Sequence, residues 1–422
     1  MLTKLNIENW KSYKQAELNV DPLTVLIGTN AGGKSNALDA LAFLNRASTG
    51  LSLTACLAGD ASNSPLRGGL EWASRHNTGR FKLGVVVEAD ETTEFRYDLE
   101  ASVKNNRCEI VSEELVRIKF RLAKGKPKKP LNPIYLLRTD PAGEDEPMLK
   151  ARLYNRGAGS LRQLSRASSL LSQLSTQSTR QEVTEGVQQV IRSLRDVFIL
   201  DPIPSHMRQF VPLSETLEHD AGNVAGVIAA LPHERQKEIE AVFSSYLSKL
   251  PERDIQRVYA ETVGKFGSDA MLYCEESWGR KGASPLVDAR GMSDGTLRFL
   301  AILTALLTRP EGSLLVIEEV DNGLHPSRAY LLIDMLKRIG EERQVDLVVT
   351  THNPALLDAL GPSAIPFITV AHRDRVTGDS CLSLLENIDN LARVLGHGPL
   401  GTLSTKGVIE RALKGEQLSL PF

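Results

Sequence analysis

The sequence contains few cysteines, few aromatic residues and no long apolar run. Its 4 cysteines among 422 residues lie far apart and form no CxxC pair, which excludes a cysteine metal site and favours free thiols. The longest largely apolar run, Phe299 to Leu307, is too short to cross a bilayer. The first residues, MLTKLNIENWK, alternate like a strand and lack the apolar core of a signal peptide. We therefore expect a cytoplasmic protein with no membrane partner.

Neither sign of charge is in excess. The chain has 50 Lys and Arg against 52 Asp and Glu, a net charge of -2, so any contact with nucleic acid needs a local patch. Hydrophobic residues make up 41% and charged residues 24%, as in ordinary globular proteins. A chain of 422 residues is long enough for two or three structural units.

Apolar periodicity divides the chain into three segments. We expect an N-terminal lobe with an antiparallel β subdomain (1–155), a mainly helical insertion (156–284) and a C-terminal lobe (285–422). Residues 51–80 are expected to form a loop, and KGKPKKP (124–130) a turn or loop. The helices predicted in the insertion are 182–196, 223–230 and 233–249. The C-terminal lobe alternates helix 295–307, strand 313–318, helix 326–340, strand 345–350, helix 353–360 and strand 365–370, which is typical of a parallel sheet.

GTNAGGKS, Gly28 to Ser35, is a phosphate-binding motif placed between an apolar strand and a helix. Its glycines let backbone N–H groups surround phosphate oxygens, and the helix N-terminus favours an anion. Lys34 is expected to reach the β- and γ-phosphates, and the Ser35 hydroxyl to bind Mg²⁺. A glycine-rich turn with no ligand would explain neither residue. The predicted nucleotide-binding residues are Gly28, Asn30, Gly32, Gly33, Lys34, Ser35 and Asn36.

LLVIEEVDNGLHP, residues 314–326, runs from an apolar strand into two adjacent glutamates. A parallel strand presents its C-terminal end where open α/β sheets bind ligands. Successive side chains there point to opposite faces, so one carboxylate can face a metal and the other a water. We assign Glu318 to Mg²⁺ and Glu319 to the attacking water. The alternative is an acidic strand end with no ligand.

Two further motifs fit a nucleotide site. TTHNP follows a predicted strand and places His352 where it can contact the γ-phosphate, although such a histidine is also often structural. Ser293, Asp294 and Gly295 precede an amphipathic helix. Serine or aspartate there serves first as an N-cap, and the same helix N-terminus also attracts an anion.

This set of motifs resembles the ABC-type ATPase heads, and within them the RecF proteins and the ATPase half of the overcoming-lysogenization-defect (OLD) nucleases. The resemblance covers most of the chain, including SLLSQLS (169–175) and HDAGNVAGVIAAL (219–231). It implies an α/β fold: a P-loop ATPase head with a mixed and parallel sheet flanked by helices, an antiparallel β subdomain and a helical insertion. It also implies ATP and Mg²⁺ as ligands, and ATP phosphohydrolase activity with Lys34, Glu319 and His352 as catalytic residues.

The resemblance further implies a composite site. In such heads the signature, here Ser293, Asp294 and Gly295, caps the nucleotide of another subunit in a homodimer or a higher homo-oligomer. Asp321 and Asn322 would lie in the loop that crosses this interface. The glutamine that completes the metal shell is expected to be Gln173, with Gln163 as the alternative.

The resemblance leaves the biological role open. Only about fifty residues follow the last predicted strand, too few for the nuclease domain that OLD proteins carry. One hypothesis is an anti-phage ATPase that gates a separately encoded nuclease or toxin. The second is a RecF-like DNA repair or replication clamp, and the third an NTPase switch for a protein partner. An adjacent nuclease gene would favour the first, and ATP-dependent binding of duplex DNA the second.

Local patches and the tail suggest further partners. Residues 117–129 are rich in Lys and Arg and can neutralise DNA phosphates, although a solvated hairpin explains them equally well. A second, weaker patch comprises Arg152, Arg156, Arg162 and Arg166. The last residues, QLSLPF, resemble the peptide that binds the bacterial sliding clamp; the alternative is a tail that packs on its own protein. The residues of this peptide are Gln417, Leu418, Leu420, Pro421 and Phe422.

Overall fold

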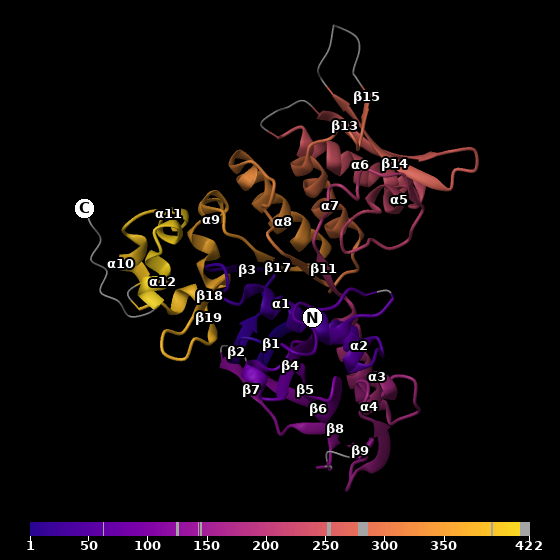
Figure 1. Ribbon diagram of the computed structural model, residues 1–422, viewed down its shortest axis with the longest axis vertical. Helices are drawn as coiled ribbons and strands as arrows, with labels where there is room; N and C mark the ends of the chain where they lie inside the picture. The colour runs from indigo at the N-terminus through magenta and orange to yellow at the C-terminus, as the bar shows by residue number, and fades with distance from the viewer. Residues whose placement is uncertain are drawn as a thin grey trace. The chain divides into compact units, whose positions relative to one another are not determined.

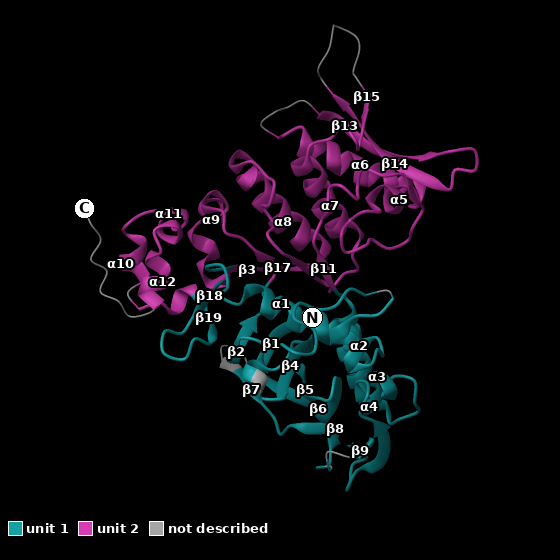
Figure 2. Ribbon diagram, in the orientation of Figure 1, with its two compact units in different colours: residues 1–21, 27–197, 369–384 teal, residues 22–26, 198–368, 385–422 magenta. Residues whose placement is uncertain are grey.

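The computed structural model shows two compact units, each built from segments that are distant in the sequence (Figure 2). Unit 1 comprises residues 1–21, 27–197 and 369–384, and unit 2 residues 22–26, 198–368 and 385–422. The structure describes residues 1–61, 63–123, 126–141, 143, 146–250, 255–276, 286–389 and 391–413. Among the helices of these residues, none combines the length and apolar character needed to cross a membrane.

Unit 1 is organised around a largely antiparallel sheet. The strands run in the order β10-β9-β8-β6-β5-β4-β1-β2-β19-β18, with β7 paired to β6. The neighbours β19 and β2 are parallel. The strand bounds are β1 Leu2–Trp10, β2 Tyr13–Asn19, β4 Arg80–Asp90, β5 Thr93–Lys104, β6 Arg107–Ala123, β7 Lys126–Pro130, β8 Ile134–Thr139, β9 Met148–Leu153, β10 Ser160–Ser165, β18 Ile368–Arg373 and β19 Ser380–Leu384.

Helices cover one face of this sheet, as Figure 1 shows. They are α1 Lys34–Ser48, α2 Leu53–Ala58, α3 Leu170–Leu174 and α4 Gln181–Arg195, with the short 3₁₀ segment η1 Arg75–Asn77. Trp10 of β1 contacts Phe43 of α1 and Phe81 of β4, with ring centroids 5.6 and 4.9 Å apart. These edge and tilted contacts fix α1 against the sheet.

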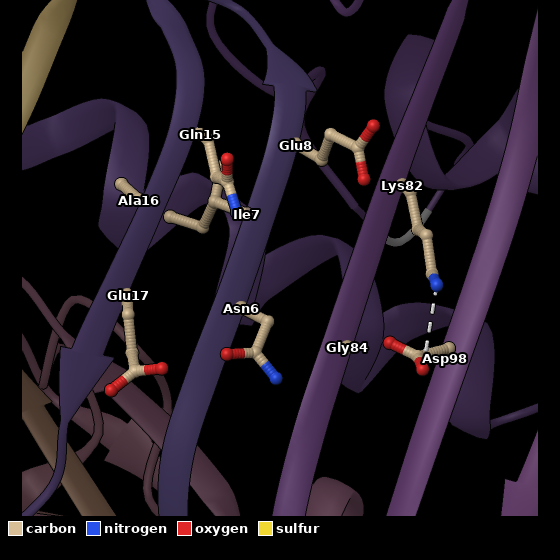
Figure 3. Close-up of a pocket in the computed structure, with 9 residues that line it drawn as sticks. All are labelled: Asn6, Ile7, Glu8, Gln15, Ala16, Glu17, Lys82, Gly84 and Asp98. Carbon is tan, nitrogen blue, oxygen red and sulfur yellow. Dashed lines mark ion pairs between the residues drawn. The ribbon is translucent and has the colours of Figure 1, made fainter.

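Polar side chains line the opposite face of the sheet where β2, β1, β4 and β5 lie side by side. A groove of about 320 Å³ lies there across β2, β1, β4 and β5 (Figure 3). Gly84 leaves a gap in the row of side chains, beside an ion pair of 3.5 Å between Lys82 and Asp98. None of the predicted site residues lines this groove.

Unit 2 contains the parallel strands. Its main strands lie in the order β3-β17-β16-β11, and the pairs β3–β17 and β17–β16 are parallel. All side chains of β16 and β17 are buried, as expected for strands covered on both faces. The strand bounds are β3 Leu23–Ile27, β11 Val197–Leu200, β16 Leu314–Ile317 and β17 Asp346–Thr350. The helices are α7 Asp294–Thr308, α8 Ala329–Arg343, α9 Pro354–Leu360, α10 Leu391–Leu395, α11 Leu400–Thr405 and α12 Val408–Leu413, with 3₁₀ segments η2 Pro326–Arg328, η3 Pro362–Phe367 and η4 Leu385–Asn387.

A second, smaller sheet belongs to unit 2. Its order is β12-β14-β13, with β15 paired to β14, and α5 and α6 pack on it. The stacked pair Tyr259–Tyr273, at 5.8 Å, joins β13 to β14. The bounds are β12 Val211–Pro212, β13 Ile255–Val263, β14 Asp269–Glu276, β15 Leu286–Asp288, α5 Val224–Ala229 and α6 His233–Leu247.

Several local predictions need correction. Residues 51–80 contain helix α2, whose N-cap Ser52 accepts a hydrogen bond from the N–H of Ala55. KGKPKKP includes strand β7, which pairs with β6. The segment 156–284 contains its predicted helices but also β10 to β14. The sheet does not end with the predicted strand 365–370, because β19 pairs with β18.

Candidate functional site

The phosphate loop, residues 28–33, follows β3 in the sequence and precedes α1, and it belongs to unit 1. Its backbone curls through left-handed conformations at Gly28 (φ 131°), Ala31 (φ 64°) and Gly33 (φ 118°). Gly33 is the N-cap residue of α1. Lys34 is buried, and its Nζ donates hydrogen bonds to the carbonyls of Gly28 (2.8 Å) and Thr29 (3.2 Å). The lysine therefore lies inside the loop that its motif predicted.

Packing requires the glycines of this loop. A Cβ placed on Gly28 would collide with the carbonyl oxygen of Ala371 in β18, and one on Gly32 would lie 2.5 Å from the same atom. A Cβ on Gly33 would lie 2.6 Å from Ser380 Oγ and 2.7 Å from Tyr13 Oη. The sequence did not predict these contacts from β2, β18 and β19.

The hydroxyl groups of Ser380 and Tyr13 lie against Gly33 and support the loop at this residue. Ser12 Oγ accepts hydrogen bonds from Asn36 Nδ2 (2.7 Å) and Ser380 Oγ (2.8 Å). Burial raises the pKa of Tyr13, whose hydroxyl has no hydrogen-bond partner among the described protein atoms. Asn36, predicted to bind nucleotide, thus directs its amide to this support. Asn30 is exposed in the loop and Ser35 is half-buried.

The two glutamates follow β16 in unit 2. Glu318 is half-buried and Glu319 exposed. Glu319 adopts φ 49°, a strained left-handed conformation for a residue with a side chain. Its N–H donates to Thr350 Oγ1 (2.8 Å) at the end of β17. Thr350 therefore holds the strained turn, a role that the sequence did not predict.

The residues after the glutamates are tied to β17 and to Glu319. Thr351 Oγ1 donates to Asp321 Oδ1 (2.5 Å), and Asn322 Nδ2 donates to Glu319 Oε2 (3.4 Å). His352 follows Thr351 and is exposed. The structure thus brings the predicted carboxylates, the predicted interface loop and the end of β17 together within unit 2.

The signature also belongs to unit 2. Ser293 is the N-cap of α7, and its Oγ accepts a hydrogen bond from the N–H of Thr296 (3.1 Å). Asp294 pairs with Arg208 (2.7 Å). A Cβ on Gly295 would lie 2.7 Å from the carbonyl oxygen of Gly323, so only glycine fits this contact.

The glutamines predicted for the metal have other roles or positions. Gln173 Oε1 accepts from the N–H of Ser165 (3.0 Å), and its Nε2 donates to the carbonyls of Ser165 and Ser168. Binding a metal would require Gln173 to give up these bonds. Gln163 is exposed on β10 and pairs with Lys150 of β9.

The basic patches are partly neutralised. Lys128 pairs with Glu88 (2.8 Å), Arg152 with Asp140 (2.7 Å) and Arg156 with Glu182 (3.0 Å). Arg166 is buried and donates to the carbonyl of Ile110. The second patch is therefore largely engaged in unit 1. The predicted clamp peptide, residues 417–422, lies outside the described residues.

Comparisons with known proteins agree with this geometry. A family model described as "AAA domain, putative AbiEii toxin, Type IV TA system" matches residues 23–358. No curated protein is significantly similar in sequence. An Smc head bound to the C-winged helix domain of ScpA is 15% identical, with a TM-score of 0.50 over 90% of this chain and 96% of that one.

A second solved structure is similar to the same extent. The Smc head domain with an extended coiled coil, bound to the C-terminal domain of ScpA from Pyrococcus furiosus, is 13% identical. Its TM-score is 0.50, covering 94% of this chain and 98% of that one. At these identities the likeness is one of fold, and it confirms the predicted fold class, an α/β head with a mixed sheet flanked by helices.

Proposed function

The chain belongs to the AAA domain family whose model matches residues 23–358, and we propose that it binds ATP with Mg²⁺ and hydrolyses it. The observation that carries this proposal is the phosphate loop. A buried strand leads into a curled, glycine-rich backbone, a helix starts at its end, and the Lys34 ammonium lies among the loop carbonyls. Lys34 can leave these carbonyls for the more strongly negative oxygens of the β- and γ-phosphates.

The carboxylates supply the hydrolytic step. Since β3, β17 and β16 are parallel neighbours, their carboxyl ends lie at one edge. The phosphate loop follows β3 in the sequence and the glutamates follow β16, which supports their action on one nucleotide. Glu319, exposed and held in a fixed turn, accepts a proton from the attacking water. His352, at the end of β17, contacts the γ-phosphate.

The chemistry of two predicted ligands fits a magnesium ion. The Ser35 hydroxyl and the Glu318 carboxylate offer the oxygen ligands that Mg²⁺ prefers. Bound together with ATP, the ion would offset negative charge on the phosphates. Gln173 is the weaker candidate for the shell, because its amide already bonds to backbone groups.

A direct test measures phosphate release by the purified chain. We expect ATP hydrolysis that requires Mg²⁺ and stops when a chelator is added. Equilibrium binding of a fluorescent ATP analogue, measured in the same preparation, separates binding from turnover. A correctly folded chain that binds no ATP at millimolar concentration would refute the proposed function.

The signature is proposed to act on the nucleotide of a second copy, with ATP held between two protomers. Ser293 and Gly295 stand at the N-terminus of the 15-residue helix α7, which favours a phosphate. Asp321 and Asn322, in the turn held by Thr351 and Glu319, are proposed to contact the partner subunit.

Substitutions at Ser293 test this arrangement without removing the helix cap. Aspartate is as good an N-cap as serine, so Ser293→Asp should keep α7 folded. Its carboxylate would repel the γ-phosphate of the second copy, and ATP-dependent dimers should be lost. ATP binding to each protomer should change by less than about threefold, since the signature contributes only in the dimer.

Light scattering with and without ATP measures the dimer, preferably in a background that hydrolyses ATP slowly. Ser293→Thr retains both the cap and the hydroxyl and serves as the matched control, expected to dimerise normally. If Ser293→Asp dimerised as readily as the control, the signature would not face a phosphate.

The biological role proposed is a switch in an anti-phage or toxin-like system, in which ATP-driven dimerisation gates a separate nuclease or toxin. The family description, which names AbiEii toxins and type IV systems, supports this role. The alternative is a RecF-like clamp on DNA, for which the basic strand β6 is the available surface. Co-purification of the native protein with a nuclease or toxin would favour the first role. ATP-dependent binding of duplex DNA by the isolated chain would favour the second.

A further inference from the structure

We propose that Arg373, on β18, is a positioning residue for nucleotide binding. Its guanidinium holds the exposed part of the phosphate loop by donating a hydrogen bond to the carbonyl of Ala31. The inference rests on the proposed function, because it concerns the same nucleotide. It assigns a role to a strand that carries none of the ATPase motifs.

The guanidinium joins the phosphate loop to the turn of its own hairpin. Arg373 Nε donates a hydrogen bond to the Ala31 carbonyl (2.9 Å), and Nη1 donates to the Gly378 carbonyl (2.6 Å). Both bonds lie within unit 1, and the bond to Ala31 joins residues 342 positions apart in the sequence. Because the guanidinium is planar, the two bonds fix its orientation as well as its position.

The turn that anchors Arg373 is itself ordered. Asp374 Oδ1 accepts from the N–H groups of Val376 (2.9 Å) and Thr377 (2.7 Å), and from Thr377 Oγ1. These bonds lower the pKa of Asp374, so its carboxylate stays charged and keeps accepting them at neutral pH. At the other end of the turn, Asp379 pairs with Arg75 (2.6 Å). The turn that binds the Arg373 guanidinium is therefore held in place by its own hydrogen bonds and ion pair.

Ala31 needs such a contact. It adopts φ 64°, a region that a residue with a Cβ seldom occupies. The peptide unit between Ala31 and Gly32 is held on both sides, because the Gly32 N–H donates to Thr29 (3.1 Å) while Arg373 binds the carbonyl. Rotation of this peptide would turn a carbonyl oxygen towards the inside of the loop. The loop attracts phosphate through N–H groups, so the rotated form would repel it.

Contacts of β18 and β19 with the glycines make the loop dependent on this hairpin. Ala371, two residues before Arg373, presses its carbonyl against Gly28 and Gly32. Ser380, at the start of β19, lies against Gly33. These contacts hold the three glycines of the loop, and Arg373 holds the exposed residue Ala31.

The test compares ATP binding and turnover in the full chain for the wild type, Arg373→Ala, Arg373→Lys and Arg375→Ala. Arg373→Ala removes the bond to Ala31 together with the bond to Gly378, and the loss of the contact with the loop should raise Kd and KM for ATP about tenfold. We expect kcat to change by less than about threefold, because the contact is not specific to the transition state. The melting temperature without nucleotide should fall by no more than about 2 °C, since Arg373 is exposed.

Two variants separate geometry from charge. Arg373→Lys keeps the charge but lacks the planar fork, so it should recover only part of the affinity. Arg375→Ala removes an exposed arginine from the same turn and should bind ATP as the wild type does. Full recovery in Arg373→Lys, or an equal loss in Arg375→Ala, would show that charge alone matters and would overturn the proposal.

The remaining outcomes are also decisive. Unchanged affinity in Arg373→Ala would overturn the proposal. So would a large fall in melting temperature with normal affinity well below the transition, which would make the contact purely structural. If the wild type bound no ATP, or bound it equally well after Lys34→Met, the proposed function would fail instead, independently of Arg373.

Discussion

Replacing Glu319 with glutamine is expected to slow ATP hydrolysis by about 10²–10⁴-fold, the usual contribution of a positioned general base. Glutamine has nearly the same shape, so the bonds from the Glu319 N–H to Thr350 and from Asn322 to the side-chain oxygen can persist. ATP should therefore still bind, and dimers that contain uncleaved ATP should accumulate. Single-turnover hydrolysis and light scattering measure the two effects.

Two comparisons test the division of roles between the glutamates. Glu318→Gln weakens a proposed metal ligand, so raised Mg²⁺ should restore part of its activity, whereas Mg²⁺ should not restore Glu319→Gln. Glu342→Gln, an exposed position at the end of α8, controls for the loss of a negative charge in unit 2. Turnover close to wild type in Glu319→Gln, or its rescue by Mg²⁺, would show that the assignment is wrong.

Lys34→Met is expected to weaken ATP binding roughly a hundredfold, the order of effect of a charged hydrogen bond to phosphate. Methionine preserves the buried apolar stem of the side chain and removes only the ammonium. The carbonyls of Gly28 and Thr29 then lose a donor, and stability should fall by about 1 kcal/mol. Titration with a fluorescent ATP analogue and thermal melting measure the two quantities.

The two predictions fail in different ways. Lys34→Met should lose affinity and turnover together, whereas Glu319→Gln should lose turnover alone. Lys34→Arg is an informative companion, because it keeps the charge but must fit a larger group into a site that is only 7% exposed. If Lys34→Met bound ATP normally, the loop would not be the phosphate site.

Sequence reasoning succeeded where local pattern and chemistry coincide. Every side chain of the apolar run at 314–317 is buried, and the helix that follows the glycines of GTNAGGKS starts at Lys34, within the motif. Such features depend on a few neighbouring residues. They predicted the parallel strands, the helix that follows the glycine-rich loop and the position of Glu319 at the end of its strand.

Contacts between distant segments could not be predicted in this way. Nothing near Ala371 or Ser380 in the sequence indicates that they lie against the phosphate loop. No rule predicts a left-handed glutamate, so the strain at Glu319 and the role of Thr350 were missed. The hairpin β13–β14 was not predicted for another reason. Its alternating residues directly follow a mainly helical stretch of sequence, so they were assigned to the helical insertion.

The position of β18 in the chain has a consequence for biosynthesis. The supporting strand β18 is synthesised more than 330 residues after the phosphate loop. At about 5–20 residues per second, that interval lasts roughly 15–70 s. During this time Gly28, Gly32 and Ala31 lack the contacts that shape the loop. A nascent chain should acquire affinity for ATP only after β18 has been synthesised, so products that end before this strand should not compete for nucleotide.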